Sequence, residues 1–176
     1  ASRAAPGAAD VLTVLSLDAC ADNGPLLMAG CATLASMCRV SDEVRHEVLA
    51  LGGAARVAAA LRAERGGAPS AAIAHQASRL AANLSCAGYA AANALLEAGA
   101  VEQLCATLRA YQSNLQVQLA ALVALLNLLS HGGAAVCAAV AAARGVELAV
   151  AAVDEQQLCR AGLPQVARWP VTSMAA

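Results

Sequence analysis

The chain has 176 residues, of which 60% are hydrophobic, and its formal net charge is −1. All 11 basic residues are arginines, spread from Arg3 to Arg168 without a run. Nucleic-acid-binding proteins gather basic side chains on one face to neutralise phosphates, so this distribution argues against a nucleic-acid partner. The chain has no Phe, two Tyr and one Trp, so Ala, Leu and Val must build the interior. The high helix propensity of Ala, Leu and Arg predicts an all-α protein.

In chain order, the predicted helices recur as two short helices followed by a longer one. The helix that begins near residue 25 has Pro25 in its first turn, where proline is well tolerated. Gly66–Ser70 is expected to be a connecting loop, and residues 163–176 an irregular C-terminal tail. The ten predicted helices cover about residues 8–20, 25–40, 42–51, 54–64, 70–86, 89–98, 100–110, 113–130, 133–143 and 145–154.

Two sequence elements recur along these helices. The first aligns residues 6–15 with residues 52–61, an offset of 46, and returns at residues 98–108 and, less faithfully, at 144–153. The second links residues 77–85 with 121–130, and its asparagines, Asn83 and Asn127, lie 44 residues apart. An earlier equivalent at residues 31–38 has Met37 where Asn is expected. Repetition at this period is typical of stacked helical repeats.

Each repeat unit therefore contains two short helices and one longer helix. Glycines such as Gly52 and Gly99 stand between the two short helices, where they allow a sharp turn. The predicted array covers residues 1–162, and it opens and closes in the middle of a repeat. Since end repeats need a polar outer face, we expect a fragment of a longer array, or ends covered by partners. The approximate repeats are residues 6–40, 41–87, 88–131 and 132–161.

The elements Gly99–Leu104 and Ala121–Leu128 resemble the armadillo repeat family. The resemblance covers about residues 6–154 and is strongest from 42 to 130. HEAT repeats are the nearest competitor, but the glycine before the second helix and the late asparagine in the third favour armadillo. The resemblance implies a right-handed α-α superhelix, a solenoid of about three to four repeats, whose third helices line a concave groove.

The resemblance also implies a set of partner-binding residues. In family members that bind extended peptides, the third-helix asparagine hydrogen-bonds the ligand backbone, and Asn83 and Asn127 occupy that position, with Met37 at the first one. Arg79 and Val123 stand where such members often carry Trp, and a groove without aromatic side chains grips a ligand's side chains weakly. Docking through a wider face is therefore an equal alternative. The two asparagines are also interpreted as structural groups that satisfy backbone atoms between repeats.

The composition also bears on the environment of the chain. Mean hydropathy is +0.60, but the apolar stretch 119–129 is too short to span a membrane, and residues 134–153 include Arg144 and Glu147. We expect a cytoplasmic, reducing compartment, with which a nuclear or cytoskeleton-associated location is compatible, and no membrane partner, metal or cofactor. The seven cysteines are irregularly spaced and are predicted to be buried thiols: Cys20, Cys31, Cys38, Cys86, Cys105, Cys137 and Cys159.

The function predicted from these patterns is a protein–protein interaction scaffold within a larger assembly. It presents a helical-repeat surface, or an extended-peptide groove, to another protein. The alternative is a permanent structural subunit of a large complex with no exchangeable ligand. An enzyme on a helical scaffold is the third hypothesis. It is the weakest because His46, His75 and His131 are isolated from any catalytic arrangement that the sequence supports.

Overall fold

The computed structural model describes residues 7–16, 23–62, 64–65 and 68–152. These residues form ten helices and one pair of two-residue strands, which confirms the all-α prediction. In chain order the elements are α1 (Ala8–Leu15), α3 (Gly24–Val40), α4 (Asp42–Ala50), α5 (Gly53–Arg62), β1 (Glu64–Arg65), β2 (Ala68–Pro69), α6 (Ala71–Ser85), α7 (Tyr89–Glu97), α8 (Ala100–Ala110), α9 (Leu115–His131), α10 (Gly133–Ala142) and α11 (Gly145–Ala152).

The predicted helix limits agree with these elements to within a few residues, and the main difference lies between α5 and α6. The helix expected over 54–64 ends at Arg62, and β1 then pairs with β2 in antiparallel fashion, with Arg65 opposite Ala68. A small hairpin thus replaces the plain loop predicted there. Residues 17–20 of the first predicted helix and the predicted tail 163–176 lie outside the described residues, as do Cys20 and Cys159.

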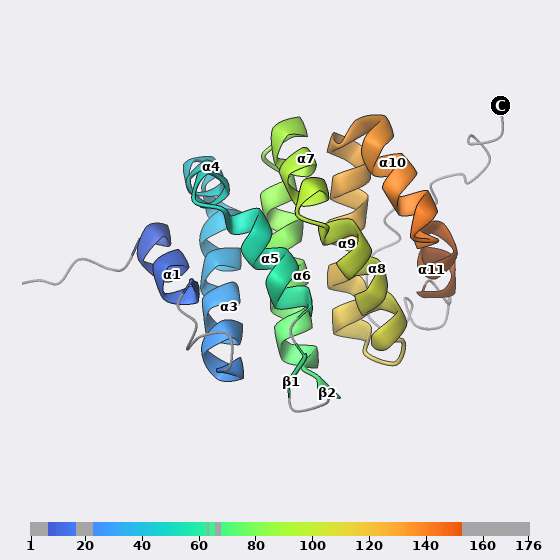
Figure 1. The fold of residues 1–176 in the computed structure, drawn as a ribbon, viewed down its shortest axis with the longest axis horizontal. Coiled ribbons are helices and arrows are strands. Elements are labelled where there is room, and N and C mark those ends of the chain that lie inside the picture. Colours follow the sequence, from blue (N-terminus) through green and yellow to red (C-terminus); the bar gives the residue numbers. More distant parts are fainter. Residues whose placement is uncertain (1–6, 17–22, 63, 66–67, 153–176) are drawn as a thin grey trace, which may run out of the picture.

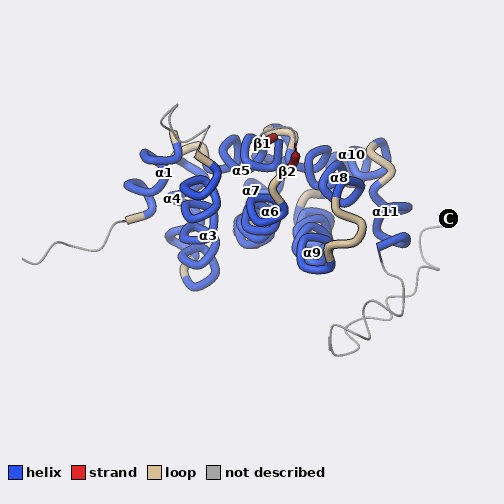
Figure 2. The backbone as a smooth tube through the Cα atoms, turned by 90° about the horizontal axis from the view of Figure 1, so that it is seen from below, coloured by secondary structure: helices blue, strands red, loops and turns tan. Residues whose placement is uncertain are grey.

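The helices are arranged in two layers (Figures 1 and 2). The long helices α3, α6 and α9 lie side by side in one layer, and α6 packs extensively against both of the others. The shorter helices, which we together call the short-helix layer, are α1, α4, α5, α7, α8, α10 and α11. Since α6 contacts α5, and α8 contacts α9, the interior lies between the two layers.

Each long helix begins at a polar N-cap. Asn23, Ser70 and Asn114 precede α3, α6 and α9, and each side chain accepts a hydrogen bond from the backbone N–H three residues later, at 3.1, 3.4 and 3.2 Å. Such a cap satisfies a donor that the first turn of a helix leaves without a partner.

Small side chains let the long helices approach closely. Ala77 and Ala81 of α6, and Ala121 and Ala124 of α9, are fully buried. Leucines from both layers fill the remaining space, which gives a close-packed interior despite the scarcity of aromatic residues. The fully buried large side chains are Leu34, Leu80, Leu84, Leu95, Leu104, Leu108, Leu128, Val48, Val57, Val101, Val117 and Val136.

The junction before α5, α8 and α11 uses a left-handed backbone conformation each time. Gly52 and Gly99 have φ of +81° and +78°, and the equivalent residue before α11 is Arg144, with φ of +55°. Glycine adopts this conformation without the steric penalty of a Cβ atom. The recurring glycine is therefore explained by the turn between two short helices, and Arg144 makes the same turn under strain.

Candidate binding groove on the third-helix face

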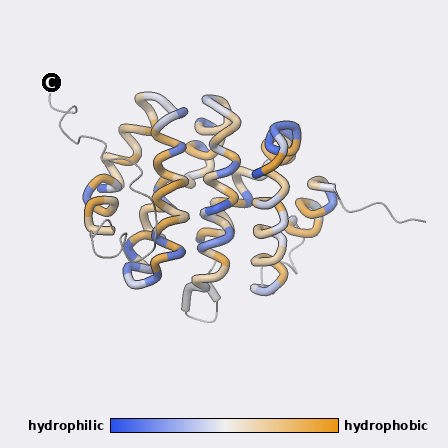
Figure 3. Tube along the Cα trace, turned by 180° about the vertical axis from the view of Figure 1, so that it is seen from behind, coloured by the Kyte–Doolittle hydropathy of each residue, from blue (hydrophilic) through white to orange (hydrophobic). Residues whose placement is uncertain are grey.

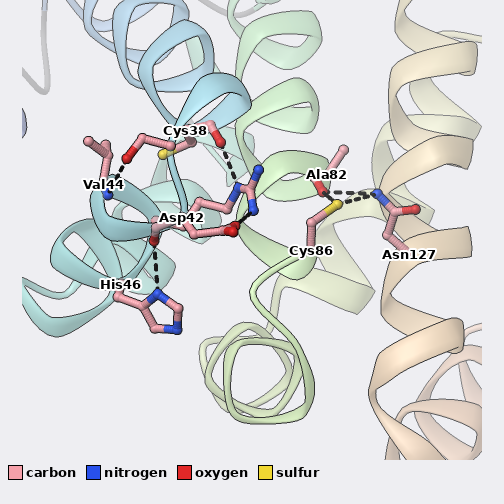
Figure 4. Close-up of polar contacts among 9 residues, drawn as sticks. Cys38, Asp42, Val44, His46, Ala82, Cys86 and Asn127 are labelled. Atoms are coloured by element: carbon pink, nitrogen blue, oxygen red, sulfur yellow. Dashed lines mark hydrogen bonds and ion pairs between the residues drawn. The ribbon is translucent and has the colours of Figure 1, made fainter.

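The outer surface of α3, α6 and α9, which we call the third-helix face, is the side viewed in Figure 3. Two asparagines hold its helices together. The amide nitrogen of Asn83 donates to the carbonyl oxygen of Ala35 at 2.7 Å, joining α6 to α3. That of Asn127 donates to the carbonyl oxygen of Ala82 at 2.9 Å, joining α9 to α6, and lies 3.4 Å from the sulfur of Cys86 (Figure 4).

These two hydrogen bonds occupy the same register in successive repeats. Asn83 and Asn127 each stand 13 residues after their caps, and Ala35 and Ala82 each stand 12 residues after theirs. The amide nitrogens thus have the structural role between repeats that the sequence left open. No described residue donates to either amide oxygen, so these oxygens are the atoms through which both asparagines can accept from a ligand.

Met37 has the same degree of burial as Asn83 and Asn127, because all three side chains are partly buried. The residues that follow them, Cys38, Leu84 and Leu128, are fully buried. This pattern agrees with the sequence alignment that places Met37 at the position of the two asparagines. Met37 packs against the core, whereas the preceding Ser36 is exposed and its hydroxyl donates to the carbonyl oxygen of Ala32 within α3.

A groove of about 440 Å³ opens on the third-helix face, with walls from α6 and α9 and one residue from the last turn of α3. It brings together three of the predicted binding residues, Arg79, Asn83 and Val123. Asn127 and Met37 are not among its lining residues. The volume lies in the range of sites that hold small ligands or a few residues of a peptide.

The wall formed by α6 and α3 is basic and polar. His75, Arg79 and Asn83 are four residues apart, which places them in one row along α6. The guanidinium of Arg79 donates to Gln76 at 2.8 Å and so is partly oriented by its own helix. Burial lowers the pKa of His75 below its ordinary value of 6.5, and the positive charge of Arg79 lowers it further. Arg39 of α3 adds a second guanidinium at this wall.

The opposite wall, from α9, is mainly apolar. Leu119, Ala120 and Val123 line it together with Gln116, and Ala82 of α6 also lines the groove. Val123 is 48% exposed, which is high for a large aliphatic side chain in a packed helix. The groove therefore combines cationic and amide groups on one side with an apolar surface on the other.

Six of the nine residues that line this groove are not among the predicted binding residues. His75 is expected from the sequence to be an isolated histidine, and the other five are Arg39, Ala82, Gln116, Leu119 and Ala120. One signal was present in the sequence, since His75, Arg79 and Asn83 recur at a spacing of four within one predicted helix. Arg39 could not be found in this way because it reaches the groove from another repeat.

The cysteines divide into buried and exposed thiols. Cys31, Cys38 and Cys105 are buried as predicted, whereas Cys86 and Cys137 are exposed, so the prediction of burial is wrong for these two. Cys86 follows the last residue of α6, and Cys137 lies on the outward side of α10, where the inward positions are Val136 and Val140. No group of three or more His, Cys, Asp or Glu side chains placed to hold a metal ion occurs among the described residues.

The apolar character of the helices does not produce a membrane-spanning segment in the described part of the chain. No helix there is by itself long and apolar enough to cross a membrane. The neighbouring helices α10 and α11 together satisfy the length and composition, but a bend of 72° separates them.

Comparison with known proteins gives one similar structure. No protein-family model matches the chain, and no curated protein matches it. The fold is similar to the crystal structure of an engineered protein determined by the Northeast Structural Genomics Consortium, with a TM-score of 0.68 and 20% sequence identity. The similarity covers 90% of this chain and 70% of that one, and at this identity it concerns the fold alone.

Proposed function

We propose that this chain is a non-catalytic, armadillo-type protein-binding module that holds an extended segment of another protein on its third-helix face. Three features support the armadillo assignment and its right-handed superhelix. The units repeat as two short helices and one long helix, left-handed glycines precede α5 and α8, and asparagines recur 13 residues after the caps of α6 and α9. Such arrays present a continuous surface formed by successive repeats.

The observation that carries the proposal is the groove, because it is open and combines two kinds of contact. An extended peptide offers backbone N–H and C=O groups along its length and side chains that alternate in direction. The amide oxygen of Asn83 and the amide of Gln116 can pair with its backbone, while Leu119 and Val123 receive an apolar side chain.

The test is selection of binding peptides from a displayed random library on the purified chain, followed by affinity measurements with two variants. Val123→Gln removes an apolar contact of the groove without changing charge, and we expect about tenfold weaker binding of the selected peptides. Leu126→Gln is the matched control, since Leu126 lies on the same helix, is 63% exposed and does not line the groove. Equal affinities for the wild type and Val123→Gln would contradict groove binding.

A second candidate function, a permanent subunit of a larger complex, is favoured by apolar side chains exposed elsewhere. Leu126 and Leu129 of α9 and Val146 and Val150 of α11 are large aliphatic residues exposed by 36 to 65%. Apolar side chains that are buried only on assembly are typical of obligate interfaces. Co-purification of the full-length protein from its own cells separates the two functions. A stoichiometric partner that survives high salt and does not displace groove-bound peptide supports the permanent subunit.

A further inference from the structure

The acidic residues in the described part of the chain all lie outside the three long helices, α3, α6 and α9, and this distribution bears on the partner class of the groove. These three helices instead contain two arginines, Arg39 and Arg79, and two histidines, His75 and His131. Three of these four cationic or titratable residues line the groove.

Among the residues that the structure describes, no carboxylate pairs with the groove's arginines. The ion pairs among the described residues are Arg45 with Asp42 and Arg144 with Glu147, both in the short-helix layer. Arg39 is exposed, and its guanidinium makes no hydrogen bond or ion pair with any described residue. Arg79 uses one nitrogen on the neutral amide of Gln76, which leaves further guanidinium donors available. The basic wall therefore has a net positive charge with donors for an anionic group.

We propose that the groove selects an acidic extended peptide, in which carboxylates contact Arg39 and Arg79 and an apolar side chain packs on Leu119 and Val123. This inference rests on the function proposed above and names its partner class. Bidentate hydrogen bonding suits guanidinium groups to carboxylates, and charge-assisted bonds are stronger than neutral ones. The basic side chains of a basic peptide would instead be repelled by Arg39 and Arg79.

The length of the row from His75 to Asn83 limits the size of the recognised segment. His75 and Asn83 are eight residues apart on α6, which corresponds to about 12 Å along a helix axis. An extended peptide covers that distance with about four residues. The recognised core is therefore about four residues, with one or two acidic side chains on the α6 side and an apolar side chain on the α9 side.

An acidic peptide is favoured over a nucleic acid by the rest of the groove. Two arginines and one histidine supply few phosphate contacts, whereas nucleic-acid affinity is built from many. The opposite wall offers aliphatic side chains rather than the aromatic side chains on which single-stranded bases stack. An apolar wall is suited to a leucine, valine or similar side chain.

The experiment extends the displayed-library selection by scoring the charge of the selected peptides. We expect enrichment of Asp and Glu next to an apolar residue, and binding that weakens roughly tenfold when salt is raised from low to high ionic strength. Arg39→Glu should weaken these peptides about tenfold, and Arg79→Gln should weaken them by a smaller factor. Arg56→Glu is the matched control, because Arg56 is an exposed arginine of α5 in the other layer, and it should leave the affinity within about twofold.

The remaining outcomes separate failure of this inference from failure of the proposed function. Peptides that depend on Val123 but carry no excess of acidic residues would overturn the inference and leave groove binding intact. If no peptide is enriched, or if Val123→Gln has no effect, both fail. A single-stranded oligouridylate that binds as tightly as the acidic peptides, with the same loss on Arg39→Glu, would show a general anion site and overturn the selectivity for peptide. Circular dichroism of each variant reports whether the helices are retained.

Discussion

The long-helix layer and the short-helix layer use different means to fix their neighbouring helices. In the long-helix layer, side chains join one helix to the next, through Asn83 to Ala35 and Asn127 to Ala82. In the short-helix layer the backbone makes the turns, through left-handed residues such as Gly99. The short-helix layer also carries the acidic side chains that the long helices lack. The long helices, which carry no acidic residue, form the face on which we propose that an acidic peptide binds.

The largest expected effect tests whether the two layers share one interior. Leu84 of α6 and Leu104 of α8 are both fully buried, so truncating either to Ala removes packing and leaves a cavity. We expect each change to lower the free energy of unfolding by about 2–5 kcal/mol, measured by urea denaturation. Val123→Ala, on the exposed side of α9, should change it by less than about 0.5 kcal/mol. A small cost at one leucine only would mean that the layers are not one cooperative unit.

A second prediction compares the reactivity of a buried thiol in the long-helix layer, Cys38, with that of an exposed thiol in the short-helix layer, Cys137. Burial raises the pKa of Cys38 from 9.0 to about 11, against a smaller opposing effect of the positive charge of Arg45. Because the thiolate is the reactive form, Cys38 should react with a maleimide at least about 100-fold more slowly than an ordinary exposed thiol at neutral pH. Exposed Cys137 is the internal comparison. Site-resolved mass spectrometry measures both, and equal rates would contradict the burial of Cys38.

The same pKa shift has a consequence for stability at high pH. The folded state holds the Cys38 proton more tightly than the unfolded state, so the contribution is complete below about pH 9 and is lost as the pH rises toward about 11. Stability should therefore decline across that range, and Cys38→Ala should make the decline shallower. Denaturation measured at several pH values checks this, and an unchanged slope in the variant would exclude Cys38 as the cause.

A smaller effect tests the side-chain hydrogen bonds of the long-helix layer. Asn83→Ala and Asn127→Ala each remove a hydrogen bond that joins two long helices, and we expect each to lower the free energy of unfolding by about 1–2 kcal/mol. Gln116→Ala, at an exposed position of α9, is the control and should cost less than about 0.5 kcal/mol. If the asparagine variants are as stable as the control, these amides serve a ligand rather than the fold.

A comparable effect and a smaller one are expected at the turns of the short-helix layer. A Cβ atom at Gly99 would meet only ordinary contacts, so Gly99→Ala should cost about 1–2 kcal/mol through its left-handed backbone alone. Arg144→Gly removes the backbone strain of the left-handed turn, but it also removes an exposed ion pair with Glu147. In addition, glycine raises the conformational entropy of the unfolded chain. We expect its net effect to stay within about 0.5 kcal/mol by thermal or urea denaturation. If both substitutions lowered the free energy of unfolding by the same amount, the left-handed turns at Gly99 and Arg144 would not be equivalent.

Much of the fold could be predicted from local signals. The helix limits follow from propensity, from caps such as Asn114 and from the glycine turns, all of which act within a few residues. Less of the candidate site could be predicted from the sequence. Arg79, Asn83 and Val123 were found through the repeat, but Arg39 and Leu119 were not, because the groove depends on how neighbouring repeats are placed side by side.

The sequence by itself determined the period of the repeat, the all-helical class and the placement of acidic residues outside the long helices, since these are properties of spacing and composition. Tertiary structure decided which side-chain atoms make contacts between helices. It assigned the amide nitrogens of Asn83 and Asn127 to the preceding long helices, packed the partly buried Met37 against the core and brought Arg39 to the row on α6. The physical reason is that these contacts join residues more than 30 positions apart, and only the packing of one helix on another sets their distance.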